Sequence, residues 1–234
     1  MSLADRSQNR MLVDGVLRRA GVDLWGAASN IPATAHAPAL PTSISLVARI
    51  DQRALEQLEQ GEPHTYRNEY RRLNALLDAA VESLAQAIQE RGREAIRTTA
   101  TVYTPLPESG DWLAAGVSAH KTAATRAGLG WIGKTALFVS HEAGPKVRLA
   151  TVFTDLELDV GEPVTESRCG SCRRCLDACP ADAGRDVAWH PGMARDLLFD
   201  AAACEAHLAE NDGTGGRTCG LCVAACPFGR TDLS

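Results

Sequence analysis

Apolar residues recur at helical spacing in two stretches of the chain. One lies in residues 1–21 and the other in residues 66–91, and a glycine that can end a helix follows each pattern, at Gly21 and Gly92. The apolar positions are Leu12, Val16 and Leu17 in the first stretch, and Leu73, Leu76, Leu77, Ala80, Val81, Leu84 and Ile88 in the second. Both patterns predict amphipathic helices with one face toward a core.

Runs of β-branched and apolar residues predict short strands between and after these helices. A segment rich in proline and alanine, residues 32–41, predicts a loop. The predicted strands cover residues 22–27, 43–50, 97–103, 136–140 and 147–154. The last two are separated by the turn sequence of residues 141–145, which predicts a β-hairpin between them. Helices mixed with strands indicate an α/β or α+β core.

All eight cysteines lie in the last third of the chain. The first four follow the spacing C-x2-C-x2-C-x3-C-P, by which bacterial ferredoxins bind [4Fe–4S] clusters. The other four repeat the last three members of that run, with the leading cysteine displaced to Cys204. In two-cluster proteins the fourth cysteine of each run binds the other run's cluster. The predicted ligands are Cys169, Cys172, Cys175 and Cys226 for the first cluster, and Cys179, Cys204, Cys219 and Cys222 for the second.

The cysteines have two alternative interpretations, zinc sites and disulfides. Zinc sites need only two separated cysteine pairs each, and this alternative stays open. Disulfide frameworks are typical of small secreted domains, whereas residues 1–6 contain no apolar core of a signal peptide. Cysteines kept for metal predict a reducing, cytoplasmic compartment. The net charge of −5 argues against a broad nucleic-acid or membrane surface, and we expect no membrane contact.

A glycine-rich segment, Gly128-x-Gly130-x2-Gly133-Lys134-Thr135, matches both the dinucleotide fingerprint and the P-loop consensus. Both motifs require a strand before the loop and a helix after it, because the helix N-terminus must point at phosphate. Here the alanine-rich residues 119–127 predict a helix before the loop, and residues 136–139 predict a strand after it. Nucleotide binding is therefore disfavoured. The glycines allow either a close approach to a bulky ligand or a sharp turn.

Four parts of the sequence together resemble the epoxyqueuosine reductases. They are Ala127–Lys134, Gly144–Ala150, Thr154–Leu156 and the cysteine segment, and the match covers about residues 118–229. Residues Gly144–Asp155 are also similar to the corrinoid reductive dehalogenases. The resemblance implies a nitroreductase-like core at residues 1–160, which holds cobalamin, and a bacterial-ferredoxin-like domain with two [4Fe–4S] clusters at residues 161–234. It also implies a short form, without the helical-repeat region with which longer members hold tRNA.

The resemblance further implies a corrinoid pocket, in which glycine permits close approach and polar side chains bind the phosphate and amide arms. The candidate residues are Gly128, Gly130, Trp131, Gly133, Lys134, Thr135, Gly144 and Arg148. The alternative for Lys134 and Arg148 is a surface charge. The acidic proton donor of the family has no counterpart in residues 116–126, so His120 is the candidate general acid, and an ordinary, partly exposed histidine is the alternative.

The resulting hypothesis is an iron–sulfur oxidoreductase. An electron donor such as a ferredoxin or flavodoxin reduces the clusters, which pass electrons to cobalamin for the reduction of a small-molecule substrate. The alternatives are an electron-transfer protein without a corrinoid, reduction of epoxyqueuosine in tRNA, and a P-loop ATPase that carries clusters.

Overall fold

The computed structural model describes residues 3–29, 40–100, 117–210 and 218–229. The chain divides into two compact units, each assembled from three segments. The sheet unit comprises Met1–Arg49, Arg72–Leu129 and Arg148–Val164. The cysteine unit comprises Ile50–Arg71, Gly130–Val147 and Thr165–Ser234.

The sheet unit is built on a four-stranded sheet with the strand order β1-β2-β6-β3. Its strands are β1 (Leu24–Ser29), β2 (Thr42–Arg49), β3 (Ala95–Thr98) and β6 (Val147–Thr154). β1 runs antiparallel to β2, with Ala27 opposite Ile44, and β3 runs antiparallel to β6, with Ile96 opposite Phe153. The unit is therefore a mixed α/β structure with antiparallel strand pairs. The predicted strands at residues 43–50 and 147–154 are confirmed as β2 and β6, and the one at 22–27 is found two residues later as β1. Of the described part of the predicted strand 97–103, only Arg97 and Thr98 lie in β3.

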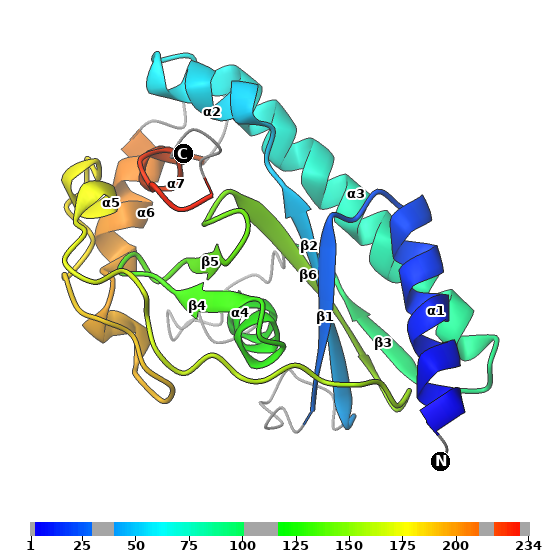
Figure 1. Cartoon of the computed structure of the whole chain (residues 1–234). Coiled ribbons are helices and arrows are strands. Elements are labelled where there is room, and N and C mark those ends of the chain that lie inside the picture. Colours follow the sequence, from blue (N-terminus) through cyan, green and yellow to red (C-terminus); the bar gives the residue numbers. More distant parts are fainter. Residues whose placement is uncertain (1–2, 30–39, 101–116, 211–217, 230–234) are drawn as a thin grey trace, which may run out of the picture. The chain divides into compact units, whose positions relative to one another are not determined.

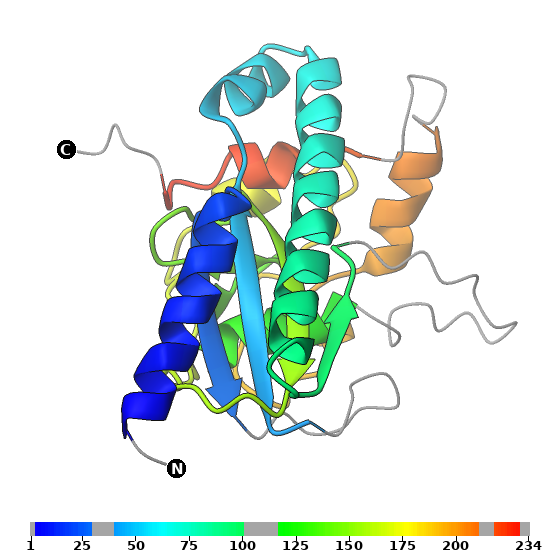
Figure 2. The ribbon, with the colours of Figure 1, turned by 90° about the vertical axis from the view of Figure 1, so that its right-hand side faces the viewer.

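Helices cover both faces of this sheet. α1 (Leu3–Arg19) and the part of α3 (Pro63–Gln89) that belongs to the sheet unit lie on one face, and α4 (Val117–Arg126) lies on the other (Figure 1, Figure 2). Leu17 of α1 and Leu84 of α3 are almost completely buried, as the helical spacing predicts. Both long helices are followed by a glycine with positive φ, at Gly21 and Gly92, where a left-handed residue can end a helix.

The cysteine unit consists of short elements. It contains α2 (Gln52–Glu59), the start of α3, a two-stranded sheet of β4 (Gly130–Ile132) and β5 (Phe138–Ser140), and four short helical segments. These segments are α5 (Arg174–Asp177), η1 (Arg195–Leu197), α6 (Ala201–Glu210) and α7 (Leu221–Ala224). α2 was not predicted; its N-cap residue Asp51 accepts a hydrogen bond from the Arg53 amide at 2.8 Å.

The predicted hairpin between residues 136–140 and 147–154 is wrong. β5 pairs with β4 instead, with Ile132 opposite Phe138, and β6 lies in the larger sheet. The amide of Gly133 donates to the carbonyl of Leu137 at 2.8 Å and closes the turn between β4 and β5. The helix before the glycine-rich segment is confirmed as α4, and the strand after it as β5, so neither nucleotide motif has its required context. Most of the predicted proline-rich loop, and residues 101–103 of the third predicted strand, lie outside the described residues.

Candidate iron–sulfur site and surrounding residues

The eight cysteines are all described, and none forms a disulfide. Seven of these residues are half-buried as a whole and Cys226 is buried. The first run occupies a turn and α5, where the amide of Cys172 donates to the carbonyl of Cys169 at 3.1 Å. The second run is divided between α6, which carries Cys204, and the region of α7.

The first predicted ligand set is close enough for its members to perturb one another. Burial raises the pKa of Cys175, and the negative charges at Cys169 and Cys172 raise it further. Burial raises the pKa of Cys226 to about 11, and Cys175 and Cys169 again contribute. Cys226 thus has the first run as its electrostatic neighbours, although it belongs to the second run in sequence.

The second predicted set shows the complementary grouping. The pKa of Cys222 is raised to about 12. Burial is the largest cause, and the negative charges at Cys219, Cys179, Cys175 and Cys204 raise it further. Burial also raises the pKa of Cys204, followed by Cys179 and Cys219. Cys179 of the first run is therefore a neighbour of the second set. Only the influence of Cys175 on Cys222 crosses between the two sets among these shifts.

The surroundings of the cysteines suit an iron–sulfur cluster, whose sulfur atoms accept hydrogen bonds. Among the described residues, no three His, Cys, Asp or Glu side chains are grouped for a single metal ion. The thiolates of a [4Fe–4S] cluster each bind a different iron, so they enclose a larger volume than the ligands of one ion. Near the second set, the Nε and Nη1 atoms of Arg195 are buried without a hydrogen-bond partner. Burial lowers the pKa of Arg195, whereas the charges of Asp196 and Cys204 oppose this shift. Cluster and thiolate sulfur atoms are suitable acceptors for such donors.

Lys134 lies in the turn after β4 with only 6% of its side chain exposed. Its Nζ donates to Oδ1 of Asp186 at 2.7 Å and to the carbonyl of Cys172 at 3.1 Å. The alternative that Lys134 is a surface charge is therefore wrong. The guanidinium of Arg148, in the sheet unit, donates to Oδ1 of Asn74 at 2.9 Å and to the carbonyl of Ala100 at 3.3 Å. The two charged candidates among the donors predicted for the corrinoid arms, Lys134 and Arg148, thus both donate to oxygens of this chain.

The four candidate glycines lie against the chain's own atoms. A Cβ on Gly128 would lie 2.8 Å from the carbonyl oxygen of Glu162, and one on Gly133 would lie 3.0 Å from Cγ2 of Val139. A Cβ on Gly130 would collide with the carbonyl of Val139, and one on Gly144 with the carbonyl of Phe228. Gly128 and Gly144 also have positive φ. Sharp turns and close packing of the chain against itself therefore explain why glycine stands at these positions, and the explanation requires no bound corrinoid.

The other candidates of the glycine-rich segment are buried as well. Thr135 is buried, and Trp131 is 1% exposed. The ring of Trp131 meets that of Phe228 edge-on at 4.9 Å between centroids, and its Nε1 has no hydrogen-bond partner. Of the residues named for the corrinoid pocket, those in the cysteine unit are buried, whereas Gly128 and Arg148 in the sheet unit are half-buried.

His120 is buried on α4 and uses both ring nitrogens. Its Nε2 lies 2.9 Å from the carbonyl of Thr99 and its Nδ1 lies 2.7 Å from Oγ1 of Thr151. Because a carbonyl only accepts, Nε2 carries the hydrogen and Nδ1 accepts from the hydroxyl. Burial lowers the pKa of His120 to about 4, so the ring is neutral at neutral pH. This environment favours a structural role, and the role of proton donor stays a prediction.

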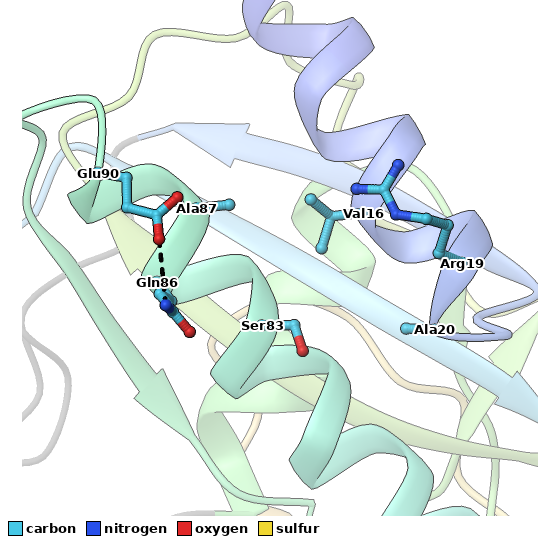
Figure 3. Close-up of a pocket in the computed structure, with 7 residues that line it drawn as sticks. All are labelled: Val16, Arg19, Ala20, Ser83, Gln86, Ala87 and Glu90. Atoms are coloured by element: carbon cyan, nitrogen blue, oxygen red, sulfur yellow. Dashed lines mark hydrogen bonds between the residues drawn. The ribbon is translucent and has the colours of Figure 1, made fainter.

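Clefts of the sheet unit lie away from the predicted site residues. One of about 290 Å³ lies between α1 and α3 and is lined by Val16, Arg19, Ala20, Ser83, Gln86, Ala87 and Glu90 (Figure 3). Another of about 490 Å³ is lined by Asp5, Gln8, Asn9, Arg91, Arg93 and Leu156. None of the candidate site residues lines either cleft.

The sequence is similar to two kinds of reductase. It is 34% identical over 119 residues to an epoxyqueuosine reductase of Cyclobacterium marinum, covering 46% of this chain and 36% of that protein. It is 33% identical over 125 residues to a tetrachloroethene reductive dehalogenase of Dehalobacter restrictus, covering 47% of this chain and 22% of that protein. The chain thus spans about a third of the length of the curated epoxyqueuosine reductases it matches. No protein-family model matches the chain.

Solved structures of the same two kinds share the fold. A catabolic reductive dehalogenase in complex with 3-bromo-4-hydroxybenzoic acid has a TM-score of 0.73 at 19% identity, covering 99% of this chain and 33% of that one. A second, described in terms of B12-dependent dehalogenation, has a TM-score of 0.70 at 19% identity with the same coverage. An epoxyqueuosine reductase bound to a modified tRNA stem loop has a TM-score of 0.57 at 16% identity, covering 96% of this chain and 66% of that one.

The chain is therefore related to reductases of the two kinds that its motifs predicted. In particular, the predicted resemblance to epoxyqueuosine reductases and corrinoid reductive dehalogenases is confirmed. Within the described ranges, no helix combines the length and apolarity needed to span a bilayer.

Proposed function

We propose that this chain is an iron–sulfur oxidoreductase of the epoxyqueuosine reductase type that carries electrons on two [4Fe–4S] clusters. The observation that carries the proposal is the cysteine pattern C-x2-C-x2-C-x3-C-P with its partial repeat. Burial raises the pKa of Cys226 and Cys204, and thiols of the other run add to both shifts, which agrees with ligands shared between the runs. When bound, the clusters would supply one-electron transfer. The thiols would bind as thiolates and release their protons on metal binding.

The surrounding residues support this assignment. The guanidinium of Arg195 lies over the ring of Phe199, and its Nε and Nη1 are buried without a hydrogen-bond partner near Cys204, so cluster sulfur would accept their hydrogen bonds. Free cysteines used for metal are suited to a reducing compartment, so we place the protein in the cytoplasm, with a ferredoxin or flavodoxin as the electron donor.

Anaerobic reconstitution with ferrous iron and sulfide tests the cluster content. The wild-type chain should hold about eight irons and show the EPR spectrum of reduced [4Fe–4S] clusters. Cys204→Ser should retain about four, because it removes a ligand of the second set alone, and Cys226→Ser should instead damage the first cluster. Ser171→Ala, at an exposed position in the first cysteine loop, is the matched control and should retain all eight. Bound zinc without iron in the wild type would establish the zinc alternative instead.

Cobalamin-dependent reduction is the second candidate. It is supported by the shared fold of the dehalogenase described in terms of B12-dependent dehalogenation. The packing around the candidate glycines does not add to that support. Titration of cobalamin into the reconstituted, oxygen-free protein would reveal binding as a change in the visible spectrum of cobalt. An unchanged spectrum would favour the alternative, an electron-transfer protein that binds no corrinoid.

The substrate class follows from two further assays under strong reductant. A halogenated phenol carboxylate tests the small-molecule substrate suggested by the dehalogenase neighbour. An epoxyqueuosine-modified anticodon stem loop tests the tRNA substrate suggested by the epoxyqueuosine reductase neighbour. Conversion of only one of them would assign the substrate class.

A further inference from the structure

The lysine of the glycine-rich segment has no role in the proposed electron transfer, yet its surroundings are specific. Lys134 follows β4 in the cysteine unit, and its ammonium is nearly inaccessible to solvent. A buried ammonium is costly unless it is paired and hydrogen-bonded. Here the pairing is supplied by Asp186 at 2.7 Å and by the carbonyl of Cys172 at 3.1 Å. Lys134 therefore points into the first cysteine loop.

Asp186 links the turn between β4 and β5 to the first cysteine loop. One carboxylate oxygen accepts from Lys134, and the other accepts from Nη1 of Arg173, the residue after Cys172. Asp186 adopts a positive φ of 54°, which is uncommon for a residue with a side chain. Arg173 also lies 3.6 Å from Asp177, but both side chains of that pair are more than half exposed and solvent screens it. Lys134 is thus the buried charge of this network.

The turn between β4 and β5 also lies close to the first predicted ligand set. A Cβ on Gly133, the residue before Lys134, would lie 3.7 Å from Sγ of Cys169. The turn and the cysteine loop are therefore in van der Waals range, and no side chain separates them at this point. A positive charge held here favours the reduced form of a neighbouring cluster, because reduction adds one negative charge.

We infer that Lys134 is a positioning residue of the first cluster loop, which fixes the Cys172 peptide and raises the reduction potential of that cluster. This inference rests on the proposed function. It gives the P-loop-like lysine a role that requires neither a nucleotide nor the phosphate of a corrinoid.

The experiment compares reduction potentials of reconstituted proteins by mediated titration followed by EPR. Lys134→Met removes the charge and both hydrogen bonds but keeps the length of the side chain. At the midpoint potential of the first cluster in the wild type, the ratio of reduced to oxidised cluster in Lys134→Met should be about tenfold lower, equivalent to 59 mV for one electron. Lys134→Arg should restore most of the ratio, and Asp186→Asn should shift it the opposite way. Lys121→Met removes the charge of a half-buried lysine of α4 and is the control for net charge, against which the shift in Lys134→Met is measured.

The first cluster is assigned as the signal that survives in Cys204→Ser. An unchanged midpoint in Lys134→Met with full iron content would overturn the inference, and so would an equal shift of both clusters. If Lys134→Met fails to retain iron, recovery of iron in Lys134→Arg supports positioning by the cation, and its loss in both variants contradicts it. A wild-type chain without about eight irons would instead overturn the proposed function, so the two failures are distinct.

Discussion

The buried His120 ring predicts a specific acid sensitivity. A neutral imidazole that donates to Thr99 and accepts from Thr151 would have to bind a proton in a buried site that already engages both nitrogens. Its folded-state pKa of about 4 lies below the ordinary value of 6.5. The stabilisation is therefore complete above pH 6.5 and is lost as the pH falls from 6.5 toward 4, because the unfolded chain then binds a proton that the folded chain does not.

The magnitude follows from these two pKa values. One pH unit corresponds to about 1.4 kcal/mol, so the full loss below pH 4 is about 3 kcal/mol. Between pH 7.5 and pH 5.0 the loss is about 2 kcal/mol, because the unfolded ring is almost fully protonated at pH 5.0 while most of the folded rings stay neutral.

His120→Gln isolates this contribution. The amide can donate to Thr99 and accept from Thr151 but does not titrate, so the free energy of unfolding of the variant lacks this dependence on pH. Urea unfolding of both proteins, in the same cluster state, should show the advantage of the wild type over the variant shrinking by about 2 kcal/mol from pH 7.5 to pH 5.0.

The control is His190→Gln, at an exposed ring outside α4, against which the change in His120→Gln is compared. An equal loss of stability in the wild type and in His120→Gln would refute the buried neutral ring. It would also support the predicted role of proton donor, since a general acid needs a pKa near its working pH.

Three other outcomes are expected. Gly130→Ala should lower the melting temperature by forcing β4 away from the Val139 carbonyl, while Gly15→Ala in α1 should be neutral or stabilising; equal melting temperatures would contradict the β4–β5 pairing. Leu84→Ala should cost about 2–5 kcal/mol in urea unfolding, and a cost under about 1 kcal/mol would show that the α3 face is not core. Titration of ATP by calorimetry should give equal, negligible heats for the wild type and Lys134→Ala, whereas heat lost in the variant would restore the nucleotide-binding hypothesis.

The local elements were largely predictable from the sequence. The spacing of apolar residues predicted α1 and α3, because an amphipathic helix leaves its period in the order of residues. The missing strand before the glycine-rich segment correctly argued against a P-loop. α2 was missed because it is short, and the signal that could have found it is the N-cap Asp51 before an apolar period.

Only the tertiary structure determined which strands pair and which distant side chains contact one another. Strand propensity does not name the neighbour of a strand, so the pairing of β5 with β4 could not be read from either segment. The roles of Lys134 and His120 were equally out of reach, because burial and hydrogen-bond partners come from residues distant in sequence. The cysteine spacing defined the candidate ligands by itself, since ligation by one tight loop is a local matter. The approach of Cys226 to the first run is a property of the folded chain, because only folding brings such distant thiols together.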